Sequence, residues 1–273
     1  MVEDMSSQAR TLANGKSIEY GPTYKQLRAI CHGKPVVAVT LAEADYHTAP
    51  ELVRLSMAEA AANGASHLWW PTWPEEQRQR MISQVRPEAE FLRQNADLLN
   101  DALPRHDLVL FLPFRKWIET DTCKTSGLAA ELSSVNAQFE IVCEEDLERT
   151  LARGFRRHED KILLTAAQSD FTSRENKLVD KFCRNGGVLL TAEKADWLTR
   201  VRSAIATPSI TIGGPNTLRA TVWDQPHRTI VHLLNLDIQR LSSFQDRVIP
   251  AKDVRVKVRD SASSQMPRAD SGC

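Results

Sequence analysis

Short apolar runs that alternate with helical segments constrain the fold of this chain more than any other feature. KPVVAVTL, residues 34–41, is a continuous valine-rich run, which is typical of a strand buried on both faces. A helix is expected over residues 50–64, because TAPE provides a capping box before it and Asn-Gly closes it. SHLWW, residues 66–70, then predicts a second strand. This order predicts a βαβ unit with parallel strands.

The same alternation continues through the middle of the chain. TWPE, residues 72–75, is a second capping box that opens a long helix, in which Pro87 predicts a kink or break. A third box, at Thr172 and Glu175, opens a later helix. Between residues 107 and 193 four strands alternate with three helices, and the expected strands are DLVLFLPF, FEIVCEEDL, KILLTAA and VLLTAE. Short connections between such elements predict an open, mainly parallel, doubly wound sheet.

The pattern changes after Pro208, where the sequence becomes rich in strands. In DVRVKVRD, valines at 254, 256 and 258 alternate with basic residues, which predicts a half-exposed antiparallel strand. A small antiparallel β module is therefore expected at the end of this region. Residues 1–25 and the Ser-rich residues 261–273 are expected to lack regular structure, because they are polar and show no periodicity.

Composition excludes several classes of function. Lys plus Arg equals Asp plus Glu at 35 each in the 273 residues, so no net charge recruits nucleic acid or an anionic membrane. No run approaches the roughly 18 apolar residues that a membrane span needs. The five cysteines form no CxxC pair, which is typical of reduced thiols in the cytoplasm. We therefore expect a cytoplasmic protein with no nucleic-acid or membrane partner.

Candidate functional residues gather after the two predicted parallel strands, where α/β folds usually carry their sites. They are Glu43, Asp45, Tyr46 and His47 after the first strand, and Trp69, Trp70 and Trp73 at or after the second. A carboxylate there could act as a nucleophile or general acid/base, or it could be an ordinary loop charge. The indoles could stack on a sugar or a nucleotide, or they could pack in a core.

Other chemistries lack their motifs. An amidotransferase needs a nucleophile elbow, but QSDFTS, after KILLTAA, offers no cysteine. Cys143 and Cys183 are interpreted as buried, inert thiols. The seven histidines show no metal-ligand spacing, and IGGPN lacks the context of a phosphate loop. No metal and no cofactor are therefore expected.

Five segments, taken in order, resemble the C-terminal portion of β-galactosidase-like glycoside hydrolases of family 42. They are GKPVVAVTLAEADYHTAPELVRLSMAEAAANGASHLWWPTW, RPEAEFLRQNADLL, ELSSVNAQFEIVCEEDL, CRNGGVLLTAE and IVHLLNLD…VIPAKDVRVKVR. Such enzymes combine a (β/α)₈ barrel, an amidotransferase-like trimerisation domain and a small C-terminal β domain. The resemblance implies that residues 34–41 and 66–70 are the seventh and eighth barrel strands. It places Glu43 at the nucleophile position and Trp69 or Trp70 at a sugar subsite.

The resemblance also implies a domain division and a limit on activity. The expected units are a disordered segment 1–25, a barrel remnant 26–103, an α/β domain 104–200, a β domain 201–260 and a disordered tail 261–273. The acid/base glutamate of such barrels belongs on the fourth strand, which has no counterpart here. The chain is therefore expected to be a fragment or one part of a split enzyme, inactive alone.

The expected partners follow from the same resemblance. They are a carbohydrate substrate, if a full barrel completes the site, and further copies of the chain, bound through the α/β domain. A non-catalytic interaction module and a carbohydrate-binding module remain open as alternatives.

Overall fold

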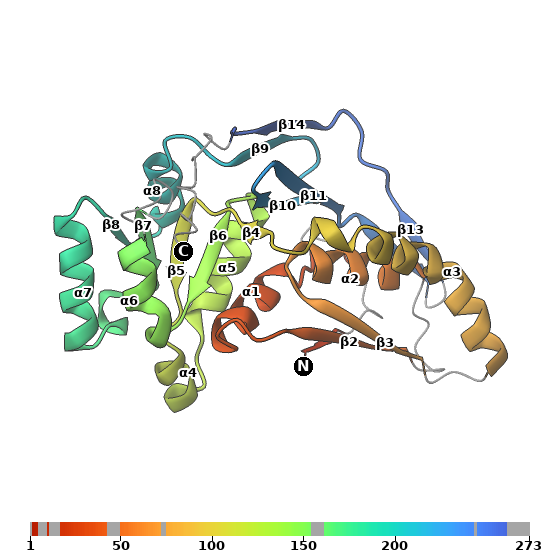
Figure 1. Ribbon diagram of the computed structural model, residues 1–273, viewed down its shortest axis with the longest axis horizontal. Helices are drawn as coiled ribbons and strands as arrows, with labels where there is room; N and C mark the ends of the chain where they lie inside the picture. The colour runs from red at the N-terminus through yellow and green to blue at the C-terminus, as the bar shows by residue number, and fades with distance from the viewer. Residues whose placement is uncertain are drawn as a thin grey trace, which may run out of the picture.

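A computed structural model describes residues 2–4, 10, 17–42, 50–71, 75–153, 161–242 and 245–260. Strands are interspersed with helices up to residue 204, and the strands that follow pair in antiparallel fashion (Figure 1). The expected α/β class is confirmed, since a short parallel sheet precedes a doubly wound parallel sheet and small antiparallel sheets.

The first sheet contains β1 (Val2–Asp4), β2 (Val37–Ala42) and β3 (Ser66–Pro71), all parallel. Helices α2 (Pro50–Ala62) and α3 (Glu75–Gln94) lie on one side of β2 and β3 (Figure 1). Among the described residues this sheet has three strands and does not close into a barrel. It is the βαβα unit that the sequence predicts.

The ends of these helices show how the sequence sets local structure. α2 ends in a Schellman motif: Gly64, at φ 70°, donates its N–H to the carbonyl of Ala61, and Ala65 donates to that of Ala60. The predicted stop at Asn63-Gly64 is thus confirmed. The break considered at Pro87 is not found, because α3 runs through it. Pro87 lies on the exposed side of the helix, where water can satisfy the carbonyl that loses its donor.

The N-terminal segment is more structured than the sequence predicts. Helix α1 (Gly21–Ile30) begins inside the segment expected to lack regular structure, and Tyr24 is fully buried. The carboxylate of Glu59 on α2 accepts the backbone N–H groups of Tyr20 and Gly21, at 2.6 and 3.0 Å. These bonds fix the start of α1, which has no side-chain cap of its own.

The second sheet is parallel, with strand order β6-β5-β7-β8. Leucines of β5 and the residues beside it pack under α1, α5 and α8, while Val109 and Phe111 pack under α6 and α7. Helices therefore cover both faces, as expected for a doubly wound sheet. The capping box at Thr172 and Glu175 is also confirmed. The elements are β5 (Leu108–Phe111), α4 (Phe114–Thr120), α5 (Lys124–Ser134), β6 (Phe139–Val142), α6 (Glu144–Arg153), β7 (Ile162–Thr165), α7 (Ser173–Arg184), β8 (Val188–Thr191) and α8 (Trp197–Ala204).

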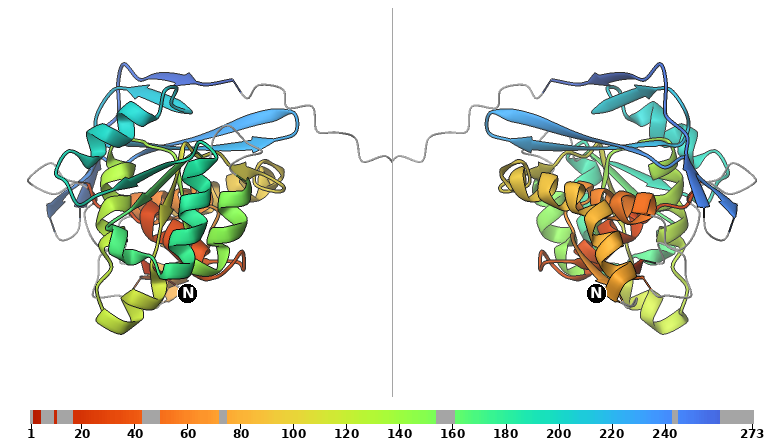
Figure 2. Two further views of the ribbon diagram at one scale, coloured as in Figure 1. Left: turned by 90° about the vertical axis from the view of Figure 1, so that its left-hand side faces the viewer. Right: turned by 90° about the vertical axis from the view of Figure 1, so that its right-hand side faces the viewer.

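Antiparallel strands run along one side of the molecule, over both parallel sheets (Figures 1 and 2). The predicted antiparallel pairing of the last strand is confirmed, since it pairs with β9, and its Val256 is 43% exposed. The pairs are β10 (Leu218–Gln225) with β11 (Arg228–Asn235) and β4 (Leu103–Pro104), β9 (Ile210–Gly213) with β14 (Arg255–Val258), and β12 (Ile238–Ser242) with β13 (Gln245–Val248).

A buried polar network attaches these strands to the α/β sheet. The Arg105 side chain, 1% exposed, donates Nε–H to Asp224 Oδ2 at 2.7 Å and also donates to Thr229 at 2.9 Å. Asp107, just before β5, accepts both the backbone N–H and the hydroxyl of Ser209, the latter at 2.6 Å. These bonds join residues that precede the strands of the α/β sheet in the chain to residues that follow them.

Candidate functional site

The edge where β2 and β3 end is the first candidate site. Ala42 pairs with Pro71 in the parallel register, so the two strands end side by side at the same edge of the sheet. The sequence analysis places its candidate residues at or after the ends of these two strands. Most of these residues lie outside the described part of the chain, namely Glu43, Asp45, Tyr46, His47, Trp73 and the side chain of Trp70.

Trp69 is the one indole of this group whose side chain is described. It is partly buried and packs against the cluster formed by Val53, Met81 and Val85, which belong to α2 and α3. It therefore lies on the face of the sheet that the helices cover. This position corresponds to the packing alternative considered for the tryptophans.

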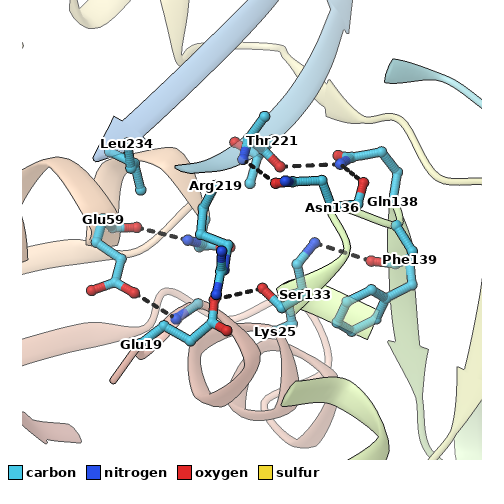
Figure 3. Close-up of a pocket in the computed structure, with 14 residues that line it drawn as sticks. Glu19, Lys25, Glu59, Ser133, Asn136, Gln138, Phe139, Arg219, Thr221 and Leu234 are labelled. Carbon is cyan, nitrogen blue, oxygen red and sulfur yellow. Dashed lines mark hydrogen bonds and ion pairs between the residues drawn. The ribbon is translucent and has the colours of Figure 1, made fainter. Parts of the chain in front are cut away.

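A second candidate lies where α1, α2, α5 and β10 meet (Figure 3). Glu19 accepts hydrogen bonds from Arg219 Nε at 2.9 Å and from the Ser133 hydroxyl at 2.7 Å. Asn136 and Gln138 bond to the backbone of β10. The cavity among these groups measures about 20 Å³, which accommodates a water molecule but not a sugar.

Lys25 lines this junction, and its pKa is shifted further from the ordinary value than that of any other basic residue there. Its ammonium donates to the carbonyl of Phe139 at 3.0 Å and lies 4.8 Å from the centre of that ring. Burial lowers the pKa of Lys25 from 10.5 to about 8, with a further contribution from Arg28, while Glu140 acts in the opposite direction. Lys25 thus changes charge inside the fold at mildly alkaline pH.

We expect the stability of the protein, relative to a Lys25→Met variant, to rise between pH 8 and 10.5. The unfolded chain holds the Lys25 proton up to about pH 10.5, whereas the folded chain releases it near pH 8. Because the unfolded state then binds more protons, stability increases with pH in this window. Urea denaturation of both proteins at pH 7.5, 9 and 10.5 measures the difference. A difference that stays constant across this range would contradict the assignment.

The third candidate is the edge of the doubly wound sheet where its strands end. Lys116 Nζ lies 2.8 Å from Asp170 Oδ1, and Arg115 donates two 2.7 Å bonds to Glu175 and approaches Glu144 at 3.1 Å. Burial alone would raise the pKa of Glu175, but the hydrogen bonds from Arg115 and Thr172 hold it below its ordinary value. The sequence analysis missed this network, although QSDFTS and the third capping box contain Asp170 and Glu175.

The thiols differ in exposure. Cys143 is fully buried, and burial raises its pKa to about 12, which agrees with an inert thiol. The prediction that Cys183 is buried is wrong, because it lies on the exposed side of α7. In the part of the chain that the structure describes, no group of three or more His, Cys, Asp or Glu residues is arranged to hold a metal. Within the same ranges, no helix is long and apolar enough to cross a membrane.

Comparisons with known proteins show a distant likeness to solved structures. No family model matches the chain, and no curated protein is similar to it in sequence. Among solved structures it is similar to alpha-L-fucosidase isoenzyme 2 from Paenibacillus thiaminolyticus, at 16% identity and a TM-score of 0.48. The match covers 79% of this chain and 34% of that chain, so the chain spans about a third of that protein's length. This likeness concerns the arrangement of elements and does not single out family 42.

Proposed function

We propose that residues 26–260 form the C-terminal part of a glycoside hydrolase that resembles family 42. The register of β2 and β3 carries this proposal, because Ala42 and Pro71 are neighbours at the edge where two parallel strands end. Successive strands of a (β/α)₈ barrel pair in this way and carry catalytic groups at that edge. The doubly wound sheet and the antiparallel strands then follow in the order that the resemblance implies.

In this proposal Glu43 is the nucleophile and Trp70 or Trp73 contacts the sugar. The packing of Trp69 on the helices favours its two neighbours for that role. A retaining glycosidase needs a second carboxyl group about 5–5.5 Å from the nucleophile to protonate the leaving oxygen. That group comes from another strand of a complete barrel, so residues 26–260 do not hydrolyse glycosides by themselves.

The α/β domain has a non-catalytic role in this proposal and holds copies of the chain together. Its carboxyl edge supports this role, because Lys116, Arg115 and their carboxylates pair with one another. The segment after β7, where an amidotransferase would place its nucleophile, forms a 3₁₀ turn over Gln168–Asp170 and contains no cysteine. Light scattering on the purified chain tests this part, and an oligomer is expected.

The catalytic part is tested by fusing residues 26–260 behind the first six βα units of a family 42 enzyme. The fusion is expected to hydrolyse an aryl β-galactoside, and Glu43→Gln is expected to lower kcat by at least about 1,000-fold, because the nucleophile is lost. Glu51→Gln, on α2, is the matched control and should retain activity. Turnover by the 273-residue chain alone would contradict the proposal. So would a folded fusion whose kcat is unchanged by Glu43→Gln.

A non-catalytic interaction module is the second candidate. Exposed apolar side chains favour it, since Leu68 on β3 is 48% exposed and Ile118 on α4 is 68% exposed. This function predicts that Glu43→Gln changes nothing in any complex, whereas a charged residue at position 118 weakens assembly. Light scattering of an Ile118→Glu variant tests whether this side chain lies in the interface, and the Glu43→Gln fusion distinguishes the two functions.

A further inference from the structure

A cavity of about 120 Å³ lies at the crossover point of the doubly wound sheet. The chain leaves β5 for β6 on one side and later places β7 on the other side, so loops diverge above β5 and β7. Crevices at this point are where open α/β sheets usually bind ligands. The cavity is lined by Leu112, Lys116, Trp117, Thr122, Thr125 and Asp170, among others.

The threonine hydroxyls of this cavity can accept hydrogen bonds from a ligand, because their own hydrogens are already donated to backbone carbonyls. Thr120 donates its hydroxyl hydrogen to the carbonyl of Lys116 at 2.7 Å. Thr122 donates to the carbonyl of Thr120, and Thr125 donates to that of Phe111, both at 3.2 Å. A threonine hydroxyl has one hydrogen, so each oxygen has only lone pairs left for a ligand. The walls therefore favour a ligand that brings its own O–H or N–H donors.

Lys116 and Asp170, which both line the cavity, form an ion pair, so their charges offset each other. Asp170, whose side chain is 4% exposed, accepts from Lys116 at 2.8 Å with Oδ1. Its Oδ2 accepts from the hydroxyl of Thr165 and the N–H of Ala167, at 3.0 and 2.9 Å. Lys116 is 44% exposed and has three N–H donors, so it can still donate to a ligand. Trp117 and Leu112 add apolar surface to the same cavity.

We propose that this cavity binds a small uncharged polyol, up to the size of one monosaccharide. Its hydroxyls donate to the threonine oxygens and accept from Lys116, while its C–H groups contact Trp117. A volume of about 120 Å³ is below the roughly 300 Å³ of drug-sized sites, so an oligosaccharide does not fit. Lys124, which is exposed, and Cys123 also line the cavity. An anion without protons would bring no donor for the threonine oxygens, and the sulfate titration below tests the choice of an uncharged ligand. This site is separate from the edge of β2 and β3 and does not depend on the glycosidase proposal.

The test uses the full chain labelled with 5-fluorotryptophan, with the Trp117 resonance assigned from a Trp117→Phe variant. Erythritol, galactose and sodium sulfate are titrated while fluorine NMR follows all six tryptophans. We expect a saturable shift of the Trp117 resonance with erythritol or galactose at millimolar concentration, with Trp197 and Trp223 unchanged. A sugar-dependent shift confined to Trp70 or Trp73 would support the barrel-edge site and overturn this one.

Variants identify the groups that recognise the ligand. Thr122→Val removes one acceptor and should weaken binding about 3- to 10-fold, because a single hydrogen bond is lost. Thr199→Val, an exposed position on α8, is the matched control and should bind as the native protein does. The proposal fails if neither polyol shifts Trp117 up to 100 mM, if sulfate shifts it instead, or if all six resonances move together. It also fails if Thr122→Val binds with unchanged affinity.

Discussion

Replacing Glu59 with alanine is expected to lower the free energy of unfolding by about 3–5 kcal/mol. Glu59 Oε2 lies 3.0 Å from Arg10 Nη1, and the two side chains are only 2% and 1% exposed. Oε1 accepts the N–H groups of Tyr20 and Gly21. The variant leaves a buried guanidinium without its carboxylate and releases the start of α1, so both costs add.

Urea denaturation followed by circular dichroism measures this loss. The matched control is Glu51→Ala on the same helix, where the carboxylate is 33% exposed and lies 3.3 Å from Arg54. An exposed pair three residues apart contributes about 0.5 kcal/mol or less. If Glu59→Ala were no worse than Glu51→Ala, the buried pair would not be what orders the N-terminal segment.

Replacing Arg105 with methionine is expected to lower the free energy of unfolding by about 2–4 kcal/mol. The side chain is 1% exposed and bonds to Asp224, Thr229 and the carbonyl of Arg259. Methionine fills part of the volume but satisfies none of these acceptors. We therefore expect the antiparallel strands to separate from the α/β sheet before the sheet itself unfolds.

Hydrogen exchange locates this loosening, since amides of β10 and β14 should exchange faster while those of β5 and β7 keep their protection. Arg228→Met is the control, because Arg228 pairs with Asp97 at 2.9 Å where both side chains are exposed, 46% and 67%. That pair is worth about 0–1 kcal/mol. Equal losses in the two variants would show that the Arg105 network contributes little.

The parallel strands could be predicted from the sequence because their signal is local. All four residues of β5, and all four of β7, are buried, which requires a continuous apolar run of the kind the sequence shows. The capping box at Thr172 and Glu175 is also local, since its groups lie three residues apart.

The features that the sequence analysis missed depend on partners far away in the chain. Arg10 and Glu59, which form the buried ion pair beside the N-terminal segment, are nearly 50 positions apart in the chain. β4 has two residues, and it is a strand because it pairs with β10, more than 100 residues later in the chain. Cys183 was misplaced because position on a helix face alone did not reveal which face meets the core. The roles proposed for Glu43, Trp70 and Trp73 remain predictions, although the ends of β2 and β3 are neighbours in the sheet.

The pairing of β4 with β10 also sets an order of events during synthesis. Arg105 and Asp224 are 119 positions apart, so at 5–20 residues per second a ribosome needs roughly 6 to 24 s between them. During that interval the α/β sheet can form, because all its strands lie between the two partners. The β10 hairpin then closes over a finished sheet, and Arg105 becomes buried only at that late step. Slow codons or a stalled ribosome before residue 218 would thus leave a folded α/β sheet with its arginine still in water.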